Sequence, residues 1–423
     1  MEKILRKIEK IIPKKVYAFF QPYYHLSLSI IGTIIHRFPS RKIYVIGITG
    51  TKGKSSTTEF INAVLEETNK KTAILSTIRF KIGDKNKPNK YKMTMPGRFF
   101  TQKFLREAVD HGCEYAIIEM TSEGARFFRH VGVQMNALIF TNLSPEHIES
   151  HGGFNNYKNA KLKLVKHLAK SKKENRIVIA NIDNEHGPSF LIHDVEKNIP
   201  YSIKDVEIIK EDESGSDIIW NNTSIHIPLP GRFNILNALS AMKLAQELGV
   251  DNETIKNGLG KLSLIRGRVE KINEGQDFTV VVDYAHTDDS LRKLYETFKT
   301  SRKIAVLGST GGGRDSWKRP AMGKVADENC QEIILTNEDP YDEDPMKIIN
   351  EVASGVKNHE PKIILDRREA IKYAISIAQK NDVILITGKG TDPYIMGPNG
   401  SKEKWDDAEV AREELIKVVG SVQ

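Results

Sequence analysis

The sequence has very little cysteine. Its 423 residues include only Cys113 and Cys330, which lie far apart. Two distant cysteines can build neither a disulfide framework nor a cysteine-based metal site. This scarcity favours a reducing compartment, so we expect a cytoplasmic protein.

Long hydrophobic runs are missing as well. The apolar stretch at residues 26–35 is too short to span a bilayer, which takes about 20 residues. The basic N-terminus has no signal-peptide cleavage pattern. Residues 15–38 are aromatic and apolar with basic flanks, so we expect this segment to pack on the following domain. Peripheral contact with a membrane surface is the alternative.

The chain also lacks short-period repeats and low-complexity tracts, which argues against a solenoid. No nucleic-acid-binding module is recognisable, so no nucleic-acid partner is expected. Hydrophobic residues make up 39% and charged residues 28% of the sequence, as in ordinary globular proteins. The formal net charge of +8 favours polyanionic partners but does not choose among them.

What the sequence does contain is a regular alternation of strand and helix patterns. Short apolar runs and amphipathic segments follow each other almost throughout, which indicates α/β layers with parallel sheets. In the first half we expect strands at residues 43–48, 73–77, 115–119, 137–141 and 177–180, and helices around 53–68, 101–111 and 157–170. Residues 201–228 predict a small excursion of short antiparallel strands outside the main sheet, and residues 234–249 predict a helix.

A second alternating series begins after Gly267 and predicts a C-terminal domain. Its expected strands are residues 278–283, 303–308, 332–336, 362–365 and 383–387, and its helices lie near 287–299, 319–328, 345–356, 367–379 and 407–419. Because the chain is too long for one ordinary core, we predict three parts. They are a short N-terminal segment (1–40), a central domain with a parallel sheet (41–264) and a Rossmann-like α/β domain (265–423).

Residues 47–58, Gly-Ile-Thr-Gly-Thr-Lys-Gly-Lys-Ser-Ser-Thr-Thr, are the most informative motif. They join an apolar strand to a helix, and backbone N–H groups at a helix N-terminus attract phosphate. Lys54 adds a charge for the β- and γ-phosphates, and the Ser55 hydroxyl suits Mg²⁺. The motif predicts a P-loop that binds ATP, with contacts from Gly50, Thr51, Lys52, Gly53, Lys54, Ser55 and Ser56.

Two further patterns accompany this loop. Glu119 ends an apolar strand, and the carboxyl end of a parallel strand beside a P-loop is a suitable place for a Mg²⁺-binding acid. The run Thr141-Asn-Leu-Ser-Pro-Glu-His-Ile-Glu-Ser-His151 is followed by Tyr157-Lys-Asn-Ala-Lys161 in a helical segment. Each feature alone is unremarkable, but their combination with the P-loop is informative.

This combination resembles the central domain of the Mur ligases, the ATP-dependent amide-bond synthetases of peptidoglycan assembly. Gly50-Thr-Lys-Gly-Lys-Ser55 resembles their G-T-[NK]-G-K-[ST] loop. The resemblance implies that CO₂ carbamylates Lys161, that the carbamate and His147 hold one Mg²⁺, and that two Mg²⁺ ions neutralise the triphosphate and an acyl-phosphate. The expected metal ligands are Ser55, Glu119, His147 and Lys161. The expected catalytic residues are Lys54, Lys161, His147 and His286.

The resemblance continues beyond the central domain. Gly231-Arg-Phe-Asn-Ile-Leu-Asn237 is similar to the family's G-x-[FH]-N-x-x-N segment, whose asparagines lie near adenine. Gly267-Arg-Val-Glu270 and Val282-Asp-Tyr-Ala-His286 match the start of its C-terminal domain. Closure of that domain is expected to bring its arginine and aspartate onto ATP. Outside the P-loop, the implied nucleotide contacts are Asn142, Asn234, Asn237, Arg268 and Asp283.

Other segments resemble the branch that adds the third residue of the peptide stem, the UDP-N-acetylmuramoyl-tripeptide synthetases. They are Gly311-Gly-Gly-Arg-Asp315, Lys318-Arg-Pro320, Thr336-Asn-Glu-Asp-Pro-Tyr-Asp-Glu-Asp-Pro345, Asp366-Arg-Arg-Glu-Ala370 and Gly388-Lys-Gly390. Thr94-Met-Pro96 resembles the branch's T-T-P substrate loop. The implied substrate contacts are Thr94, Arg314, Glu338, Asp339, Tyr341, Gly388 and Asp392.

One departure from this branch bears on the amino acid. The D-N-P-R motif, whose arginine binds the distal carboxylate of meso-diaminopimelate, is Glu338-Asp-Pro-Tyr341 here. A phenol cannot replace an arginine that binds a carboxylate through two hydrogen bonds. This favours L-lysine or another diamino acid as the amino-acid substrate. Candidates to hold its amino groups are Asp339 and Asp392. Candidates to clamp a carboxylate are Arg367, Arg368 and the region of Arg314.

Two other departures concern the acceptor. The family's S-S-H is Thr121-Ser-Glu123 here, which puts a negative charge near the substrate cleft. Mur ligases normally place a UDP-binding domain before the P-loop, whereas about 40 residues precede it here, too few for a domain with its own core. We expect either a minimal uridine element around Tyr23, Tyr24 and His25 or a different anchor, such as a lipid.

The resemblance thus implies a monomeric ligase that joins a free amino acid to UDP-MurNAc-L-Ala-D-Glu through an acyl-phosphate. Three alternatives stay open. A folylpolyglutamate synthetase shares the loop, and an amidating ligase for lipid-linked precursors shares the short N-terminus but carries a four-cysteine zinc site. A non-enzymatic ATP-binding scaffold is the third, although the retained Lys54, Glu119, His147 and Lys161 argue against it.

Overall fold

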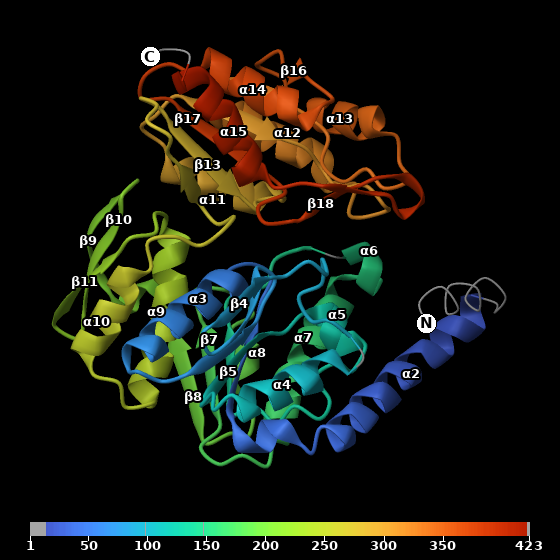
Figure 1. Cartoon of the computed structure of the whole chain (residues 1–423), viewed down its shortest axis with the longest axis vertical. Helices are drawn as coiled ribbons and strands as arrows, with labels where there is room; N and C mark the ends of the chain where they lie inside the picture. Colours follow the sequence, from blue (N-terminus) through green and yellow to red (C-terminus); the bar gives the residue numbers. More distant parts are fainter. Residues whose placement is uncertain (1–13, 98, 147, 421–423) are drawn as a thin grey trace. The chain divides into compact units, whose positions relative to one another are not determined.

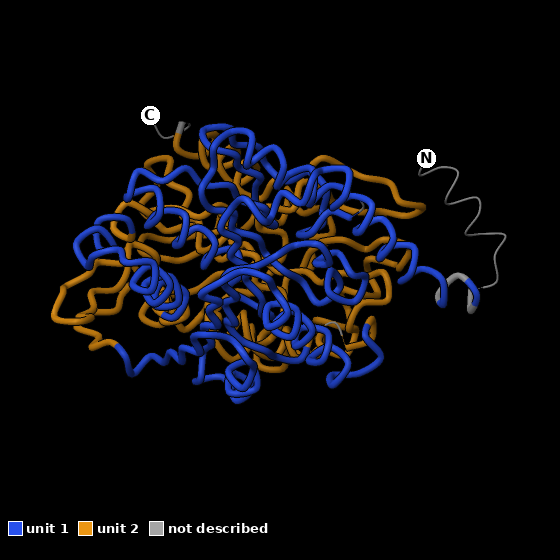
Figure 2. The backbone as a smooth tube through the Cα atoms, turned by 90° about the horizontal axis from the view of Figure 1, so that it is seen from below, with its two compact units in different colours: residues 1–145, 151–205, 236–258 blue, residues 146–150, 206–235, 259–423 orange. Residues whose placement is uncertain are grey.

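The computed structural model describes residues 14–97, 99–146 and 148–420. The chain divides into two compact units. Unit 1 comprises residues 1–145, 151–205 and 236–258, and unit 2 comprises residues 146–150, 206–235 and 259–423 (Figure 2). Among the described residues, no helix has the length and apolar character needed to cross a membrane.

An eight-stranded sheet organises unit 1 (Figure 1). Its order is β4-β3-β2-β5-β1-β6-β7-β8, and all neighbours are parallel from β2 to β8, while β3 and β4 add antiparallel strands at one edge. The bounds are β1 (Tyr44–Thr49), β2 (Thr72–Leu75), β3 (Arg79–Ile82), β4 (Lys85–Pro88), β5 (Tyr115–Glu119), β6 (Ala137–Phe140), β7 (Ile177–Asn181) and β8 (Lys197–Tyr201).

Helices cover both faces of this sheet. Alternate strand residues such as Val45, Ala116 and Leu138 form one core with α4 and α7, whereas α3 packs against β1, β2 and β5 from the other face. Burial on both faces explains why these strands are continuous apolar runs in the sequence. The helices are α2 (Lys14–Ile35), η1 (Pro39–Lys42), α3 (Lys54–Glu67), α4 (Phe100–Asp110), α5 (Ser122–Arg126), α7 (Phe154–Ala169), α8 (Pro188–Leu191) and η2 (Ile203–Asp205). Three helices cross the unit boundaries: α6 (Ile148–His151), α9 (Arg232–Glu247) and α10 (Asn252–Lys261).

Unit 2 contains a six-stranded sheet of order β12-β13-β17-β14-β15-β16, parallel except for the edge strand β12. One face packs on α11, α12 and α13, and the other on α14 and α15. The strands are β12 (Glu270–Ile272), β13 (Thr279–Asp283), β14 (Lys303–Leu307), β15 (Glu332–Leu335), β16 (Lys362–Ile363) and β17 (Val383–Thr387). The helices are α11 (Asp288–Thr297), α12 (Lys318–Asn329), α13 (Pro345–Ala353), α14 (Arg367–Ile377), η3 (Pro398–Gly400) and α15 (Asp407–Gly420).

Two small sheets complete unit 2. An antiparallel sheet consists of β9 (Glu207–Asp212), β10 (Gly215–Trp220) and β11 (Thr223–Ile227), and a hairpin of β18 (Tyr394–Met396) and β19 (Lys402–Lys404). The first of these sheets confirms the antiparallel strands predicted for residues 201–228.

The predicted α/β class is confirmed, with a parallel sheet around the P-loop and a second α/β layer structure in the C-terminal half. The buried strands were found by their apolar runs, each within a few residues of its bounds. Strands β3, β4, β8, β12, β18 and β19 were not predicted, because they are short and lack a continuous apolar run; all four residues of β4, for example, are exposed. The proposed domain limits at residues 41 and 265 stay predictions.

Candidate active site

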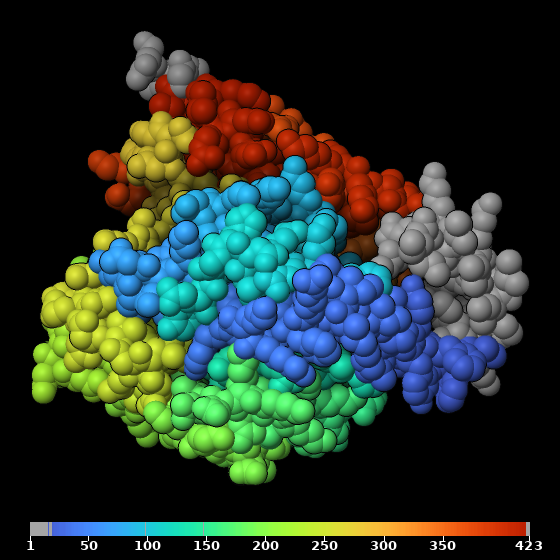
Figure 3. All heavy atoms as spheres, turned by 60° about the horizontal axis from the view of Figure 1, so that its bottom comes forward, coloured from blue at the N-terminus to red at the C-terminus, as the bar shows by residue number. Residues whose placement is uncertain are grey.

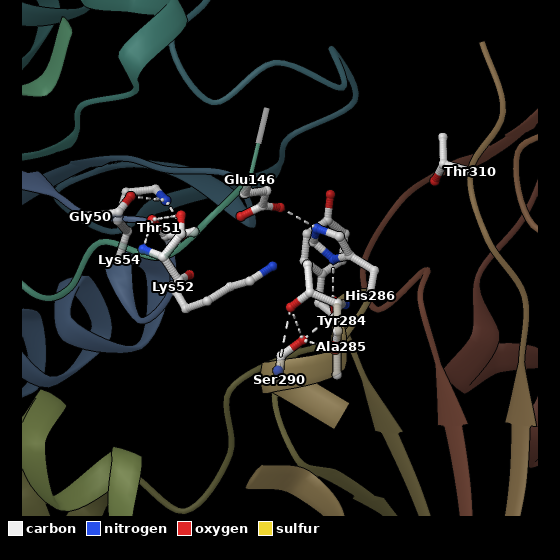
Figure 4. A network of polar contacts seen from close by, with 12 residues as sticks. Gly50, Thr51, Lys52, Lys54, Glu146, Tyr284, Ala285, His286, Ser290 and Thr310 are labelled. Carbon is white, nitrogen blue, oxygen red and sulfur yellow. Dashed lines mark hydrogen bonds and ion pairs between the residues drawn. The ribbon is translucent and has the colours of Figure 1, made fainter. Parts of the chain in front are cut away.

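The P-loop connects β1 to α3. Gly53 caps the helix with φ +83°, a left-handed conformation that favours glycine, and a Cβ there would collide with the Asn237 amide oxygen. The Lys54 amine donates to the carbonyl oxygens of Gly50 and Thr51, at 2.9 Å each (Figure 4). Lys54 is thereby held over the loop.

The loop is braced by the strand end that follows β6. Asn142 accepts from the backbone N–H of Lys52 at 2.9 Å and donates to the carbonyl oxygen of Lys52 at 3.1 Å. Its own carbonyl accepts from the N–H of Thr51 at 2.8 Å. The Asn142 side chain therefore binds both backbone polar groups of Lys52.

Lys161 reaches the same loop from α7. Its side chain is buried, and its amine donates to the carbonyl oxygen of Gly50 at 2.7 Å. The amine also lies 4.8 Å from the ring centre of Tyr157, whose hydroxyl is 3.0 Å from that of Thr51. The predicted residues Lys54 and Lys161 therefore meet at one carbonyl.

Glu119 lies at the end of β5, in register with Ile48 of β1 just before the loop. It is fully buried. Its carboxylate accepts from the N–H of Thr77 at 3.1 Å and from the Thr77 hydroxyl at 2.8 Å, and that hydroxyl lies 2.8 Å from the Thr94 hydroxyl. Thr77 thus links two predicted residues. The sequence analysis missed it because a lone threonine after a strand carries no motif.

The predicted metal set is only partly visible. His147 lies outside the described residues. Within residues 14–97, 99–146 and 148–420, no three His, Cys, Asp or Glu side chains gather into a metal-binding group. Ser55 and Ser56 are buried at the start of α3.

Asn234 and Asn237 lie one turn apart on α9. Asn234 donates to the carbonyl oxygen of Pro230 at 2.9 Å. Asn237 accepts from the Thr57 hydroxyl at 3.4 Å, so it lies beside the first turn of α3. Asn237 therefore contacts the P-loop helix.

In unit 2, the predicted nucleotide contacts gather at the end of β13. Asp283 accepts from the N–H groups of Val269 at 2.8 Å and Ala285 at 2.7 Å. The Arg268 guanidinium lies 4.6 Å from the ring centre of Tyr284. The negative charge of Asp392, followed by burial, raises the pKa of Tyr284 well above its usual value.

His286 is positioned by polar contacts at both ring nitrogens. Its Nδ1 lies 2.6 Å from the carbonyl oxygen of Tyr284 and its Nε2 lies 2.7 Å from Glu146 Oε1 (Figure 4). These two contacts fix the orientation of the imidazole ring.

Glu338 follows β15 and is buried with one carboxylate oxygen unsatisfied. Its Oε1 accepts from the Thr310 hydroxyl at 2.6 Å, whereas Oε2 accepts no hydrogen bond from a described residue. Gly388 lies against Oε2, and a Cβ there would collide with it. A buried carboxylate oxygen without a donor is costly unless a cation or N–H binds it.

Asp339 points elsewhere. Its Oδ1 accepts from the buried amine of Lys389 at 2.8 Å and from the N–H of Met396 at 2.8 Å. Asp392 lies 3.8 Å from the same amine. The sequence analysis treated Lys389 as part of a motif only, and its charge pairing could not be seen there.

Tyr341 has φ +52°, and its ring centre lies 5.3 Å from the Arg314 guanidinium, which also donates to the phenol oxygen at 3.3 Å. The other candidate arginines are engaged. Arg367 is buried in a bidentate pair with Asp407, and Arg368 pairs with Glu413 and Glu414. Both guanidinium groups are thus engaged in ion pairs, and the suggestion that Arg367 or Arg368 clamps a substrate carboxylate stays a prediction.

Comparisons with known proteins agree with this arrangement. Residues 48–245 match the Mur ligase middle domain, and residues 267–390 match the Mur ligase, glutamate ligase domain. The chain is 36% identical to the UDP-N-acetylmuramoyl-L-alanyl-D-glutamate–2,6-diaminopimelate ligase of Clostridium tetani (strain Massachusetts / E88), over 87% of this chain and 77% of that protein. A protein of the same name from Bacillus velezensis (strain DSM 23117 / BGSC 10A6 / LMG 26770 / FZB42) is 34% identical, over 93% and 82%.

Solved structures show the same fold. A UDP-N-acetylmuramoyl-L-alanyl-D-glutamate–2,6-diaminopimelate ligase aligns with a TM-score of 0.60 at 28% identity, over 89% of this chain and 79% of that one. The folylpolyglutamate synthase of Mycobacterium tuberculosis aligns with a TM-score of 0.70 at 14% identity, over 87% and 93%, which is a likeness of fold alone. With both domains matched in order and ligase relatives above 30% identity over most of their length, the chain belongs to the Mur ligase family, whose members are enzymes that use ATP to form C–N bonds.

Proposed function

We propose that this chain is an ATP-dependent amide ligase that adds a diamino acid to UDP-MurNAc-L-Ala-D-Glu in peptidoglycan synthesis. The observation that carries the proposal is the meeting of Lys54 and Lys161 at the carbonyl oxygen of Gly50. It joins a P-loop lysine to the lysine that the family resemblance singles out. The names of the relatives support the acceptor.

The residues at the loop fit ATP with Mg²⁺. Backbone N–H groups from Gly50 to Ser56 face phosphate in such a loop, and Lys54 adds a positive charge. Glu119 is a buried carboxylate that forms no ion pair with any described residue, which is costly unless a cation compensates it. Hydroxyl and carboxylate oxygens are the donors that Mg²⁺ prefers. We assign two Mg²⁺ ions to Ser55, Glu119, the carbamate of Lys161 and His147, with the carbamate and His147 holding the second ion.

The carbamate would form when the Lys161 amine attacks CO₂ and loses one proton. The product is an anion within reach of the loop. Bound Mg²⁺ would supply charge stabilisation for the triphosphate and the phosphoryl group that leaves it.

The proposed chemistry has two steps. The acceptor carboxylate attacks the γ-phosphorus of ATP, which gives an acyl-phosphate and ADP. The amine of the amino acid then attacks the acyl carbon, loses a proton and expels phosphate, which gives the amide. Lys54 would stabilise charge on the transferring phosphoryl group. Asp392, or His286 held between Tyr284 and Glu146, would assist removal of the proton from the amine.

We assign the remaining nucleotide contacts to Asn142, Asn234, Asn237, Arg268 and Asp283. Asn142 and Asn237 would act by holding the P-loop, since both contact it or the first turn of α3. Arg268 and Asp283 would act from unit 2. The limits 41–264 and 265–423 are proposed as the two catalytic domains. A lipid-linked acceptor, membrane contact through residues 15–38 and a monomeric state stay predictions.

The free amino acid is proposed to be L-lysine, bound with its side-chain ammonium on Glu338 Oε2. That oxygen is buried and unsatisfied, so an ammonium would remove the cost of its burial. Tyr341 offers no charge to a distal carboxylate. Thr94, Gly388 and Asp392 would complete the substrate contacts, and Asp339 would act through Lys389, which it holds in place.

The test is phosphate release with UDP-MurNAc-L-Ala-D-Glu, ATP and a panel of amino acids. We expect turnover with L-lysine and kcat/KM for meso-diaminopimelate lower by about tenfold or more. Preference for meso-diaminopimelate would overturn the amino-acid assignment, and would point to Arg314 as the carboxylate clamp. If no amino acid gives phosphate release, whereas folate and glutamate do, the proposed function in peptidoglycan synthesis would be overturned.

A further inference from the structure

The N-terminal helix α2 packs on unit 1 through its polar side. Ser29 and Thr33 are buried on this side, and the Ser29 hydroxyl donates to the carbonyl oxygen of Phe128 at 3.0 Å. Gly32 approaches the Phe99 ring so closely that a Cβ would lie 2.8 Å from it. His25 packs against Phe127, with ring centres 5.2 Å apart and ring planes inclined by 58°. Small and polar residues therefore form the contact with the rest of the unit.

The opposite side of α2 is apolar and faces outward. Its exposed large hydrophobic residues are Val16, Phe19, Phe20, Tyr23, Tyr24, Ile30, Ile31, Ile34 and Ile35. At about 100° per residue they fall within less than half of the helix circumference. Part of this helix forms the blue surface in Figure 3. This orientation reverses the usual one, in which a surface helix buries its apolar side.

The expectation that residues 15–38 pack on the following domain is therefore only half right. The helix does pack, but its apolar side, whose burial would be most favourable in free energy, stays exposed to solvent. Nine large apolar side chains on one stripe need a partner that is itself apolar.

The charged residues that flank the stripe indicate which kind of apolar partner fits it. No Asp, Glu, Lys or Arg occurs between Val16 and Ile35. Both ends are basic, with Lys14 and Lys15 before the stripe and the exposed Arg37, Arg41 and Lys42 after it. Residues 1–13 add four basic and two acidic residues in sequence. An apolar stripe between basic ends, with Phe and Tyr along it, is the composition of a helix that lies in the surface of an anionic bilayer.

A second copy of the chain fits less well. In a parallel pair of α2 helices, Lys14 and Lys15 would lie beside their own equivalents. In an antiparallel pair they would lie beside Arg37 and Arg41. Basic ends meet in either orientation, and this repulsion opposes pairing. An anionic surface attracts both ends at once.

We propose that α2 docks this chain on an anionic membrane surface, with its axis in the plane of the bilayer and the stripe from Val16 to Ile35 in the headgroup region. The inference does not rest on the proposed ligase activity, because it is argued only from the packing, the exposed side chains and the flanking charges of α2. The proposed docking concerns where the chain is located and adds no second reaction.

Flotation of the full chain with vesicles tests this proposal. Wild-type protein should float with vesicles rich in phosphatidylglycerol and far less with phosphatidylcholine alone, and added salt should weaken the binding. The double variant Phe19→Glu/Ile34→Glu should reduce the bound fraction by about tenfold or more. Ile192→Glu, at a residue 80% exposed elsewhere in unit 1, is the matched control and should bind like wild type.

Three results would overturn the proposal. The first is a wild-type chain that floats with neither kind of vesicle, and the second is a double variant that floats like wild type. The third is a wild-type dimer in light scattering that the double variant converts to a monomer without any vesicle binding, which would assign the stripe to a second copy. Unchanged thermal unfolding of the double variant shows that a loss of flotation is not a loss of fold.

Discussion

The side-chain amine of Lys161 lies 2.7 Å from the carbonyl oxygen of Gly50, which also accepts from Lys54 at 2.9 Å. Lys161 and Gly50 are 111 residues apart in the chain. Two lysines at one carbonyl concentrate positive charge in the P-loop. Conversion of one of them to a carbamate would reverse the sign of that charge and would create an acceptor for a cation.

Replacement of Lys161 by Ala should abolish phosphate release, with a loss of about a hundredfold or more, because the anion that the carbamate supplies would be missing. Added short-chain carboxylic acids should restore part of the activity by filling the space with a carboxylate. Lys163→Ala, at an exposed position of the same helix, is the control and should retain activity. Full activity of Lys161→Ala would remove the carbamate from the mechanism.

Gly53→Ala should weaken ATP binding far more than it lowers stability. Gly53 has φ +83° and faces Asn237 at the cap of α3. Gly112 has a similar φ of +70°, but nothing lies within 4 Å of a Cβ there. Both alanine variants should lose about 1 kcal/mol of stability from backbone strain. Calorimetric titration with ATP should show weaker binding for Gly53→Ala alone, and equal affinities for both variants would contradict the role of this cap.

Tyr341→Arg should shift the amino-acid preference toward meso-diaminopimelate. A guanidinium at this position can bind a distal carboxylate with two hydrogen bonds, which a phenol cannot. The ratio of kcat/KM for meso-diaminopimelate to that for L-lysine should rise by about tenfold or more. Tyr341→Phe removes only the hydroxyl and should leave the ratio near its wild-type value. An unchanged ratio in Tyr341→Arg would mean that another residue selects the amino acid.

Asp339→Asn should destabilise unit 2 by up to about 3–5 kcal/mol, because the buried Lys389 amine would lose its nearer carboxylate and keep only that of Asp392, 3.8 Å away. Asp289→Asn makes the same chemical change in an exposed pair with Lys293 and should cost about 1 kcal/mol or less. Differential scanning calorimetry of the full chain compares the two. Equal and small effects would show that Asp339 is not needed to hold Lys389.

Unit 1 should lose stability below neutral pH through His130. Burial, followed by the charge of His167, lowers the pKa of His130 from 6.5 to about 3. The unfolded chain takes up a proton below pH 6.5 while the folded chain does not, so acid favours unfolding. Between pH 7 and pH 5 this loss amounts to about 2 kcal/mol. In His130→Asn that part of the pH dependence should vanish, and an unchanged pH profile would contradict a neutral His130.

The sequence by itself determined the order of elements and the chemistry of the P-loop. Buried parallel strands are continuous apolar runs, so their positions follow from local composition. Gly53, Lys54 and Ser55 act through backbone conformation and a helix N-terminus, which are properties of neighbouring residues. Glu119 was located as a strand end for the same reason. The polar edge strands β3 and β4 lack this local signal.

Only the tertiary structure decided which distant groups meet. It brought Lys161 to Gly50 and linked Thr94 to Glu119 through Thr77. It also engaged Asp339 with Lys389, which no spacing in the sequence announces. The apolar pattern of α2 predicted burial, yet packing used its polar side. Local patterns record which residues favour burial, whereas long-range packing selects the face and the partner, because that choice depends on surfaces contributed from other parts of the chain.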